Sequence, residues 1–155
     1  MNNQIKDVLK NSKTIAMIGV SSLKKKEDPQ NLKRKPSTIV MKYMQDYGYR
    51  VIPINPFAKG ETIYGETVIA ELKDIDIPID IVDVFRPSKE TPAIAEQAVK
   101  IGAKTLWLQY GISHEDAKKI ASKAGINYFE NLCIKQEYQR IFKKMSPVFP
   151  ALKSQ

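Results

Sequence analysis

The sequence has little of the two residue types that most often build metal sites and cross-links, because its 155 residues include one cysteine and one histidine. Cys133 alone cannot form an internal disulfide, and His114 alone cannot build a histidine-rich metal site. Zinc fingers and disulfide scaffolds are therefore excluded.

Long apolar runs are also missing. The longest ones have about the length of a β-strand, far below the ~18 residues of a membrane-spanning helix. The stretch from Met1 to Lys13 mixes polar and charged residues, with no apolar core ahead of a small-residue cleavage site. We therefore expect no signal peptide, no membrane partner and a cytoplasmic location.

Length and composition predict one globular domain. The 155 residues correspond to a single domain, and 43% apolar with 27% charged residues is ordinary for a folded protein. We expect the domain over residues 1–145 and an irregular tail over 146–155, which contains Pro147 and Pro150.

Positive charge is in excess and unevenly spread. Lys and Arg total 25 against 17 Asp and Glu, which gives a net charge of +8. Residues 24–35 hold six basic and two acidic residues, so this segment alone carries net +4. The excess favours an anionic partner, and a solvated surface loop is the alternative explanation. The six basic residues are Lys24, Lys25, Lys26, Lys33, Arg34 and Lys35.

Short apolar segments alternate with helical ones along the chain. The apolar runs predict strands at residues 14–19, 49–54, 79–85, 105–108 and 126–129. Helical spacing predicts helices that begin at Ser37, Thr91, Ser113 and Asn131. The predicted fold is therefore α/β, a Rossmann-like three-layer domain with a five-stranded parallel sheet and helices on both faces.

Several polar residues have structural explanations in this scheme. Ser113, with Asp116 three positions later, predicts a capping box, and Asn131 predicts the cap of the last helix. We expect His114 to be exposed beside the first of these caps. Asp83 falls in a buried strand, where an unpaired carboxylate is costly, so we expect a structural role for it.

The loop after the first strand predicts a phosphate site. Gly19 allows a close approach, Ser21 and Ser22 offer hydroxyls, and the helix that begins near Ser37 adds free N–H groups and a positive dipole end. A plain strand-to-helix turn is the alternative. The G-x-G-x-x-G fingerprint is absent, because Ser21 and Lys24 stand where glycines would be needed.

The next loops disfavour NAD and extend the predicted site. The second strand ends at Asn55 and Pro56, where an NAD-binding domain places an acid to hold the ribose. Phe85 could cover a base or belong to the core, and Arg86 could pair with a phosphate. Gly111 permits another close approach. These loops favour a phosphorylated nucleotide other than NAD.

Several motifs in order resemble the small bacterial CoA-binding domain proteins. The motifs are Ile18-Gly19-Val20-Ser21, Lys35-Pro36-Ser37, the run 51–56, the run 82–86 and the run 102–109. The resemblance extends from about Thr14 to Arg140. These proteins are similar in fold to the CoA-binding domain of the succinyl-CoA synthetase alpha subunit, in which the ligand rests across the carboxyl ends of the strands.

The resemblance implies coenzyme A as the cofactor and a set of binding residues. Gly19, Val20, Ser21 and Ser22 would meet the diphosphate; Asn55, Pro56 and Lys59 would line the adenosine side; Phe85, Arg86, Gln109 and Gly111 would border the pantetheine path. Lys35, Pro36, Ser37, Asn131 and Cys133 complete the predicted ligand-binding residues. No catalytic or metal-binding residue is predicted.

The first hypothesis is a module that binds CoA or an acyl-CoA without catalysis. The synthetase carries its phosphorylated histidine in a further domain, so the resemblance implies no catalysis for this domain. The alternatives are an acyl-CoA ligase subunit that needs a partner chain, an NAD-binding redox sensor, and a nucleic-acid binder. Ser21 and Asn55 disfavour the redox sensor, and the single basic loop without interleaved aromatics disfavours nucleic acid. The sequence leaves open whether the chain forms a homo-oligomer.

The sequence allows two roles for Cys133. At the start of the last helix it could form a mixed disulfide with CoA, which would link redox state to ligand binding. A small buried core residue is the commoner role of a free cysteine. Cys133 is followed by Ile134, whereas small relatives often have proline there, so the local loop shape differs from the family pattern.

Overall fold

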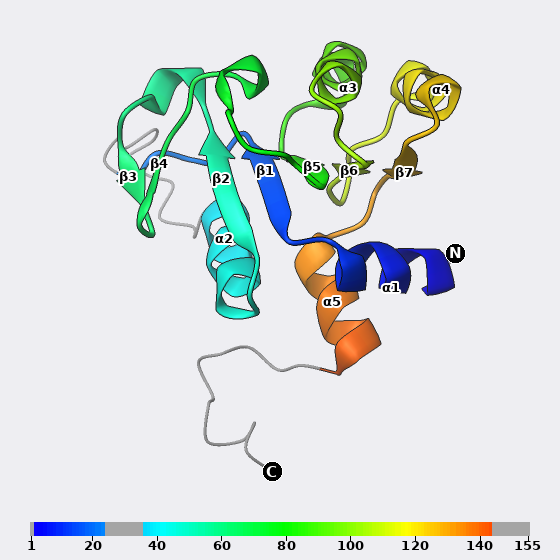
Figure 1. The fold of residues 1–155 in the computed structure, drawn as a ribbon, viewed down its shortest axis with the longest axis horizontal. Coiled ribbons are helices and arrows are strands. Elements are labelled where there is room, and N and C mark those ends of the chain that lie inside the picture. Colours follow the sequence, from blue (N-terminus) through cyan, green and yellow to red (C-terminus); the bar gives the residue numbers. More distant parts are fainter. Residues whose placement is uncertain (1, 24–35, 144–155) are drawn as a thin grey trace.

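A five-stranded parallel sheet forms the centre of the protein, as the computed structural model in Figure 1 shows for residues 2–23 and 36–143. The strand order is β2-β1-β5-β6-β7. The strands are β1 (Thr14–Ile18), β2 (Arg50–Ile54), β5 (Ile81–Val84), β6 (Thr105–Leu108) and β7 (Asn127–Phe129). This arrangement confirms the predicted sheet, with shifts of one or two residues at several strand ends.

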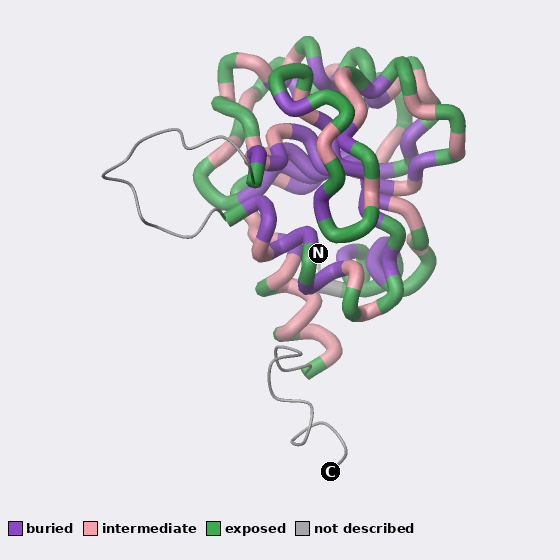
Figure 2. The backbone as a smooth tube through the Cα atoms, turned by 90° about the vertical axis from the view of Figure 1, so that its left-hand side faces the viewer, coloured by how far each residue is buried: buried purple, intermediate pink, exposed green. Residues whose placement is uncertain are grey.

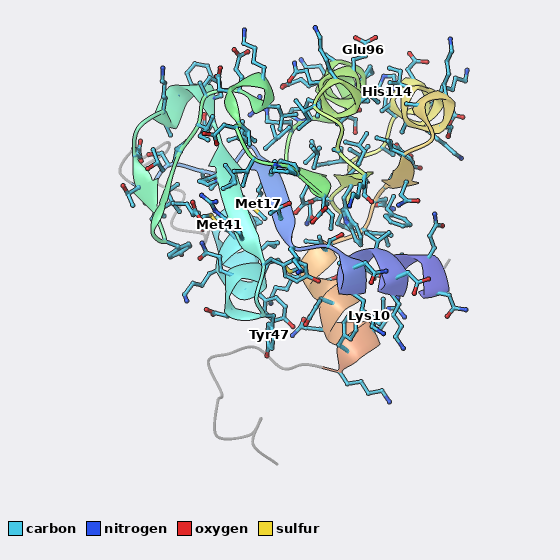
Figure 3. The ribbon with its side chains drawn as sticks, in the orientation of Figure 1. Lys10, Met17, Met41, Tyr47, Glu96 and His114 are labelled. Carbon is cyan, nitrogen blue, oxygen red and sulfur yellow. The ribbon has the colours of Figure 1, made fainter. Side chains whose placement is uncertain are left out.

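Helices cover both faces of the sheet, which confirms the predicted three layers (Figure 1). One face is covered by α1 (Asn2–Asn11), α2 (Pro36–Asp46) and α5 (Ile134–Phe142), and the other by α3 (Thr91–Lys100) and α4 (Glu115–Ala124). Buried residues follow the strands through the middle of the molecule (Figure 2). Met17 of β1 and Met41 of α2 belong to the core of the first face (Figure 3).

The chain reverses its direction of winding at β1. This strand pairs with β2 on one side and with β5 on the other, and Ile18 lies beside both Ile54 and Val84. In open α/β sheets the crevice at such a switch point, beyond the carboxyl ends of the strands, is where ligands bind. The ends of β1 and β5 are therefore the first place to look for a site.

Helix α1 is absent from the predicted elements. Ile5, Val8 and Leu9 are spaced to fall on one face of this helix, and all three are buried in the core. Tyr49 fixes the end of α1, because its hydroxyl donates to the carbonyl oxygen of Leu9. The remaining positions are polar, so only the spacing indicates a helix.

A two-stranded hairpin between β2 and β5 is also absent from the prediction. It consists of β3 (Thr62–Ile63) and β4 (Glu66–Thr67), and Tyr64 and Gly65 turn the chain with positive φ values of 46° and 84°. Short 3-10 helices complete the connections: η1 (Pro56–Ala58), η2 (Leu72–Asp74) and η3 (Ser88–Glu90).

The predicted helix caps at Ser113 and Asn131 are wrong. His114 caps α4, because its Nδ1 accepts from Asp116 N at 3.0 Å, and it is half-buried rather than exposed. Cys133 occupies the N-cap position of α5, with no capping hydrogen bond from its side chain. Gln109 satisfies that helix start instead, accepting from Ile134 N at 3.1 Å.

Asp83 lies in the middle of β5 and is fully buried. It is in register with Met17 and Trp107, and its carboxylate oxygens have no hydrogen-bond partner among the described residues. Burial raises the pKa of Asp83 well above its ordinary value, and the neighbouring Val84 N–H acts in the opposite direction without cancelling this effect. The side chain is therefore neutral over a wider pH range than an exposed aspartate.

Neither a metal cluster nor a membrane span occurs in the described part of the chain. Residues 2–23 and 36–143 contain no group of three or more His, Cys, Asp or Glu that could hold a metal ion. Over the same ranges, no helix has the length and apolar character needed to cross a membrane.

Candidate functional site

A cleft of about 260 Å³ opens at the switch point. Its walls come from the ends of β1 and β2, the loops that follow β2 and β5, the segment before η2, and α3. The structure brings four of the predicted binding residues into these walls: Gly19, Asn55, Pro56 and Arg86. Ile18, Ile54 and Ile94, all buried, form an apolar part of the cleft.

Gly19 has no room for a side chain. Its φ is +91°, and a Cβ on it would lie 2.8 Å from the carbonyl oxygen of Phe85 and 3.0 Å from Cδ of Arg86. Its N–H donates to Ile54 O at 2.9 Å, so the backbone is fixed on the β2 side as well. Glycine is therefore required here by the packing of the chain itself.

Asn55 joins the loops that follow β1 and β2. Its Nδ2 donates to Val20 O at 2.9 Å, and its Oδ1 accepts from Phe57 N at 2.9 Å. The side chain thus stabilises the cleft wall and caps η1. An acid at this position could not make the first of these bonds.

The loop after β1 is tied to α2 and to the hairpin. Ser21 N donates to Ser37 Oγ at 3.0 Å, which holds the loop on the first turn of α2. Ser22 is buried, and its hydroxyl lies 2.8 Å from both carboxylate oxygens of Glu61. Neither Val20, Ser21 nor Ser22 lines the cleft.

Arg86 carries the positive charge of the described cleft walls. Its Nε donates to Glu90 Oε1 at 3.0 Å, and its Nη2 donates to Glu90 Oε2 at 2.8 Å. The hydrogen bonds from Arg86 keep the pKa of Glu90 below its ordinary value, and the same contact raises the pKa of Arg86. Glu71 is a further acid in the walls.

Four of the predicted ligand-binding residues form a separate cluster, and two of them, Gln109 and Gly111, are predicted to border the pantetheine path. Asn131, with a φ of 58°, accepts from Gly111 N through its Oδ1 at 2.7 Å. This contact and the bond between Gln109 and Ile134 join the loop after β6 to the start of α5. Gln109, Gly111, Asn131 and Cys133 are not among the residues that line the cleft. Their contact with a ligand stays a prediction.

The remaining predicted residues that the structure describes are not among those that line the cleft. Phe85 is half-buried and packs against the core, and Lys59 and Pro36 are exposed. Lys35, with the rest of the basic segment 24–35 and the tail 146–155, falls outside the described residues.

Some cleft residues are absent from the prediction. Phe57 lines the cleft, and 78% of its surface is exposed. Glu90 and Gln97 line it from the side of α3. Arg86 and Glu90 are four positions apart but do not share an α-helix, so the helical spacing rule does not indicate their contact.

Residues 13–139 match the family described as CoA binding domain. The chain belongs to this family. Membership agrees with the resemblance drawn from the strand-end motifs and supports CoA binding in general.

Named relatives extend this finding. An uncharacterized protein of Bacillus subtilis (strain 168), YneT, is 38% identical over 132 residues, which are 85% of this chain and 90% of YneT. The structure of cell-free ID.343 from Thermus thermophilus has a TM-score of 0.80 and 33% identity, and the match covers 92% of this chain and 99% of that one.

A larger protein shares the fold. The dinucleotide-forming acetyl-coenzyme A synthetase 1 of Ca. Korarchaeum cryptofilum, in complex with phosphate and ADP, has a TM-score of 0.61 and 21% identity. The match covers 84% of this chain and 28% of the synthetase. At this identity the likeness shows the fold alone.

Proposed function

We propose that this protein binds CoA or an acyl-CoA across the carboxyl ends of its parallel strands and has no catalysis of its own. The observation that carries the proposal is a cleft at the β1/β5 switch point in a chain of the CoA binding domain family.

The cleft has the chemistry to take the adenosine end of such a ligand. Its apolar part can bury a base, and the exposed ring of Phe57 at its edge can stack on one. The start of α2 lies close to the loop after β1, because Ser21 N is bonded to Ser37 Oγ. Free N–H groups at a helix start favour phosphate. Lys59, exposed after η1, adds a positive charge on the same side.

The NAD alternative has weaker support. An NAD site uses a carboxylate at the end of the second strand to accept from the ribose hydroxyls. Here Asn55 uses both ends of its amide inside the protein.

A ligase subunit that acts with a partner chain is the second candidate, and the fold shared with a synthetase favours it. The one histidine of the sequence, His114, uses its Nδ1 to cap α4, so we assign it no catalytic role.

Isothermal titration with CoA, acetyl-CoA, dephospho-CoA, NAD and ATP tests the proposal. We expect CoA and acetyl-CoA to bind with similar affinity, and NAD to bind much more weakly. Binding of NAD without binding of CoA would overturn it. Incubation of the protein with acetyl-CoA, followed by assay of free thiol, tests the absence of catalysis. Release of CoA above the rate in buffer would favour an enzyme.

A further inference from the structure

Within the cleft, the guanidinium of Arg86 is already occupied by a carboxylate. Glu90 accepts from Nε at 3.0 Å and from Nη2 at 2.8 Å, each donor meeting a different carboxylate oxygen. A phosphate group takes the same side-on, two-point geometry on arginine. Glu90 therefore stands where an anionic group of a ligand would bind.

The charges of the cleft make this contact important. The described residues that line the cleft include one basic residue, Arg86, and two acidic residues, Glu71 and Glu90. Glu71 has a basic neighbour in Lys73, at 3.4 Å, whereas Glu90 is paired with Arg86 itself. The full positive charge of Arg86 is available to a ligand phosphate only when the Glu90 carboxylate has moved away from the guanidinium.

Both members of the ion pair between Arg86 and Glu90 are open to solvent, since the Arg86 side chain is 43% exposed. The side chain of Glu90 is 38% exposed, and its only hydrogen bonds within the described residues are the two to Arg86. The Cδ of Arg86 lies beside Gly19, because a Cβ added to this glycine would come within 3.0 Å of it. An ion pair this exposed is weak in water, so a dianionic group can replace one of its members.

We propose that Glu90 acts as an internal substitute for a ligand phosphate on Arg86, and that binding of a phosphorylated ligand exchanges the carboxylate for phosphate. Glu90 thereby lowers affinity for phosphorylated ligands and leaves affinity for neutral ones unchanged. The inference deepens the proposed function and rests on the cleft being the CoA site. The ligand chemistry that it selects is an organic diphosphate or phosphomonoester with enough charge to displace a carboxylate.

The test compares the purified full chain with Glu90→Gln, Arg86→Gln and the double variant. Glu96→Gln is the matched control, because Glu96 is exposed on the outer side of α3 and lies outside the cleft (Figure 3). The probes are CoA, inorganic pyrophosphate and pantetheine, each titrated at low and at moderate salt. Thermal unfolding of each variant verifies that it is folded.

We expect Glu90→Gln to bind CoA and pyrophosphate about three- to tenfold more tightly than the wild type. Glu96→Gln should change either affinity by less than about twofold, since the charge of Glu96 is solvent-exposed and screened and does not line the cleft. In the Arg86→Gln background the gain from Glu90→Gln should vanish, which separates exchange at Arg86 from a general change of charge. Pantetheine should bind all five proteins equally.

Three results would overturn the proposal. They are a gain no larger than that of Glu96→Gln, a gain that persists without Arg86, or a loss of CoA affinity in Glu90→Gln. The last would mean that Glu90 positions Arg86 for the ligand. The proposed function fails separately, if the wild type and all variants bind pyrophosphate but not CoA.

Discussion

The side-chain amide of Asn55 donates to the carbonyl oxygen of Val20 at 2.9 Å, so the loop after β2 holds the loop after β1 in place. The other end of the amide accepts from Phe57 N. Contacts between the loops of the protein therefore hold the cleft in shape. Changes that break those contacts should alter both stability and binding.

Asn55→Asp keeps the shape of the side chain and the acceptor for Phe57, but it removes the donor to Val20. A carboxylate would then face a carbonyl oxygen. We expect a loss of about 1–3 kcal/mol in the free energy of unfolding. We also expect CoA binding at least about tenfold weaker, with no gain in NAD binding. Urea denaturation and calorimetric titration measure these effects.

Asn131→Asp is the control for this change. The bond of Asn131 to Gly111 N uses only its Oδ1, which aspartate retains. Its stability should stay close to that of the wild type. Equal losses in the two variants would mean that added negative charge, and not the donor to Val20, is responsible.

Gly19→Ala should be far more destabilising than a similar change at another glycine. Gly19 and Gly125 both have positive φ, +91° and +76°. A Cβ on Gly19 would lie 2.8 Å from Phe85 O, whereas one on Gly125 would meet nothing within 4 Å. Both variants lose about 1 kcal/mol or more from backbone strain. Only Gly19→Ala adds the clash, so its Tm should fall clearly further, and similar Tm values would contradict this account.

Asp83 and Asp80 should give opposite pH dependences of stability. The pKa of Asp83 is raised by burial, so above its ordinary pKa the folded state keeps a proton that the unfolded state releases. Its contribution to stability is present below the unfolded pKa and lost as pH rises through the folded pKa. Asp83→Asn removes this loss. The Tm of the variant minus the Tm of the wild type should therefore increase as the pH is raised from 5 to 8.

Asp80 provides the matched comparison. Burial raises its pKa, but the N–H groups of Lys13 and Thr14 and the charge of Lys104 lower it more, so the net direction is downward. Stability from Asp80 is present above the unfolded pKa and lost as pH falls through the folded pKa. Asp80→Asn should therefore destabilise at neutral pH and have less effect in acid. The same slope for both variants would refute the assignment.

The parallel sheet could be predicted because each central strand is a short apolar run buried on both faces. Helix α1 could not be predicted with equal ease, since three apolar residues among polar ones carry its signal. The hairpin is harder still, because two-residue strands leave no alternating pattern. Tertiary contacts decide such elements.

The site divides in the same way. Gly19 and Asn55 could be predicted from their places at strand ends, where the fold positions a ligand. Their partners could not be, because Asn55 and Val20 are 35 positions apart, and Ser22 and Glu61 are 39 apart. A sequence motif also does not show that the side chain of a predicted ligand-binding residue makes its hydrogen bonds to other residues of the protein.

The basic segment supports a prediction from charge alone. The described walls of the cleft carry one more acid than base, so additional positive charge from elsewhere in the chain would favour a phosphorylated ligand. Replacement of Lys33, Arg34 and Lys35 by glutamine should weaken CoA binding more than dephospho-CoA binding, and should flatten its salt dependence. Calorimetric titration at several salt concentrations measures this. Equal losses for the two ligands would separate the segment from the phosphates.

Cys133 should form no mixed disulfide with CoA under mild oxidation. Such a disulfide needs the Cys133 thiolate to attack a sulfur of oxidised CoA, with CoA thiolate leaving, so the thiol must be accessible to that sulfur. Cys133 is half-buried, packs against the hydrophobic core and is not among the residues that line the cleft. Intact-mass measurement after incubation with oxidised CoA tests this, with Cys133→Ser as the control. A CoA adduct on the wild type alone, at low molar excess, would instead place the thiol on the ligand path and couple CoA binding to redox state.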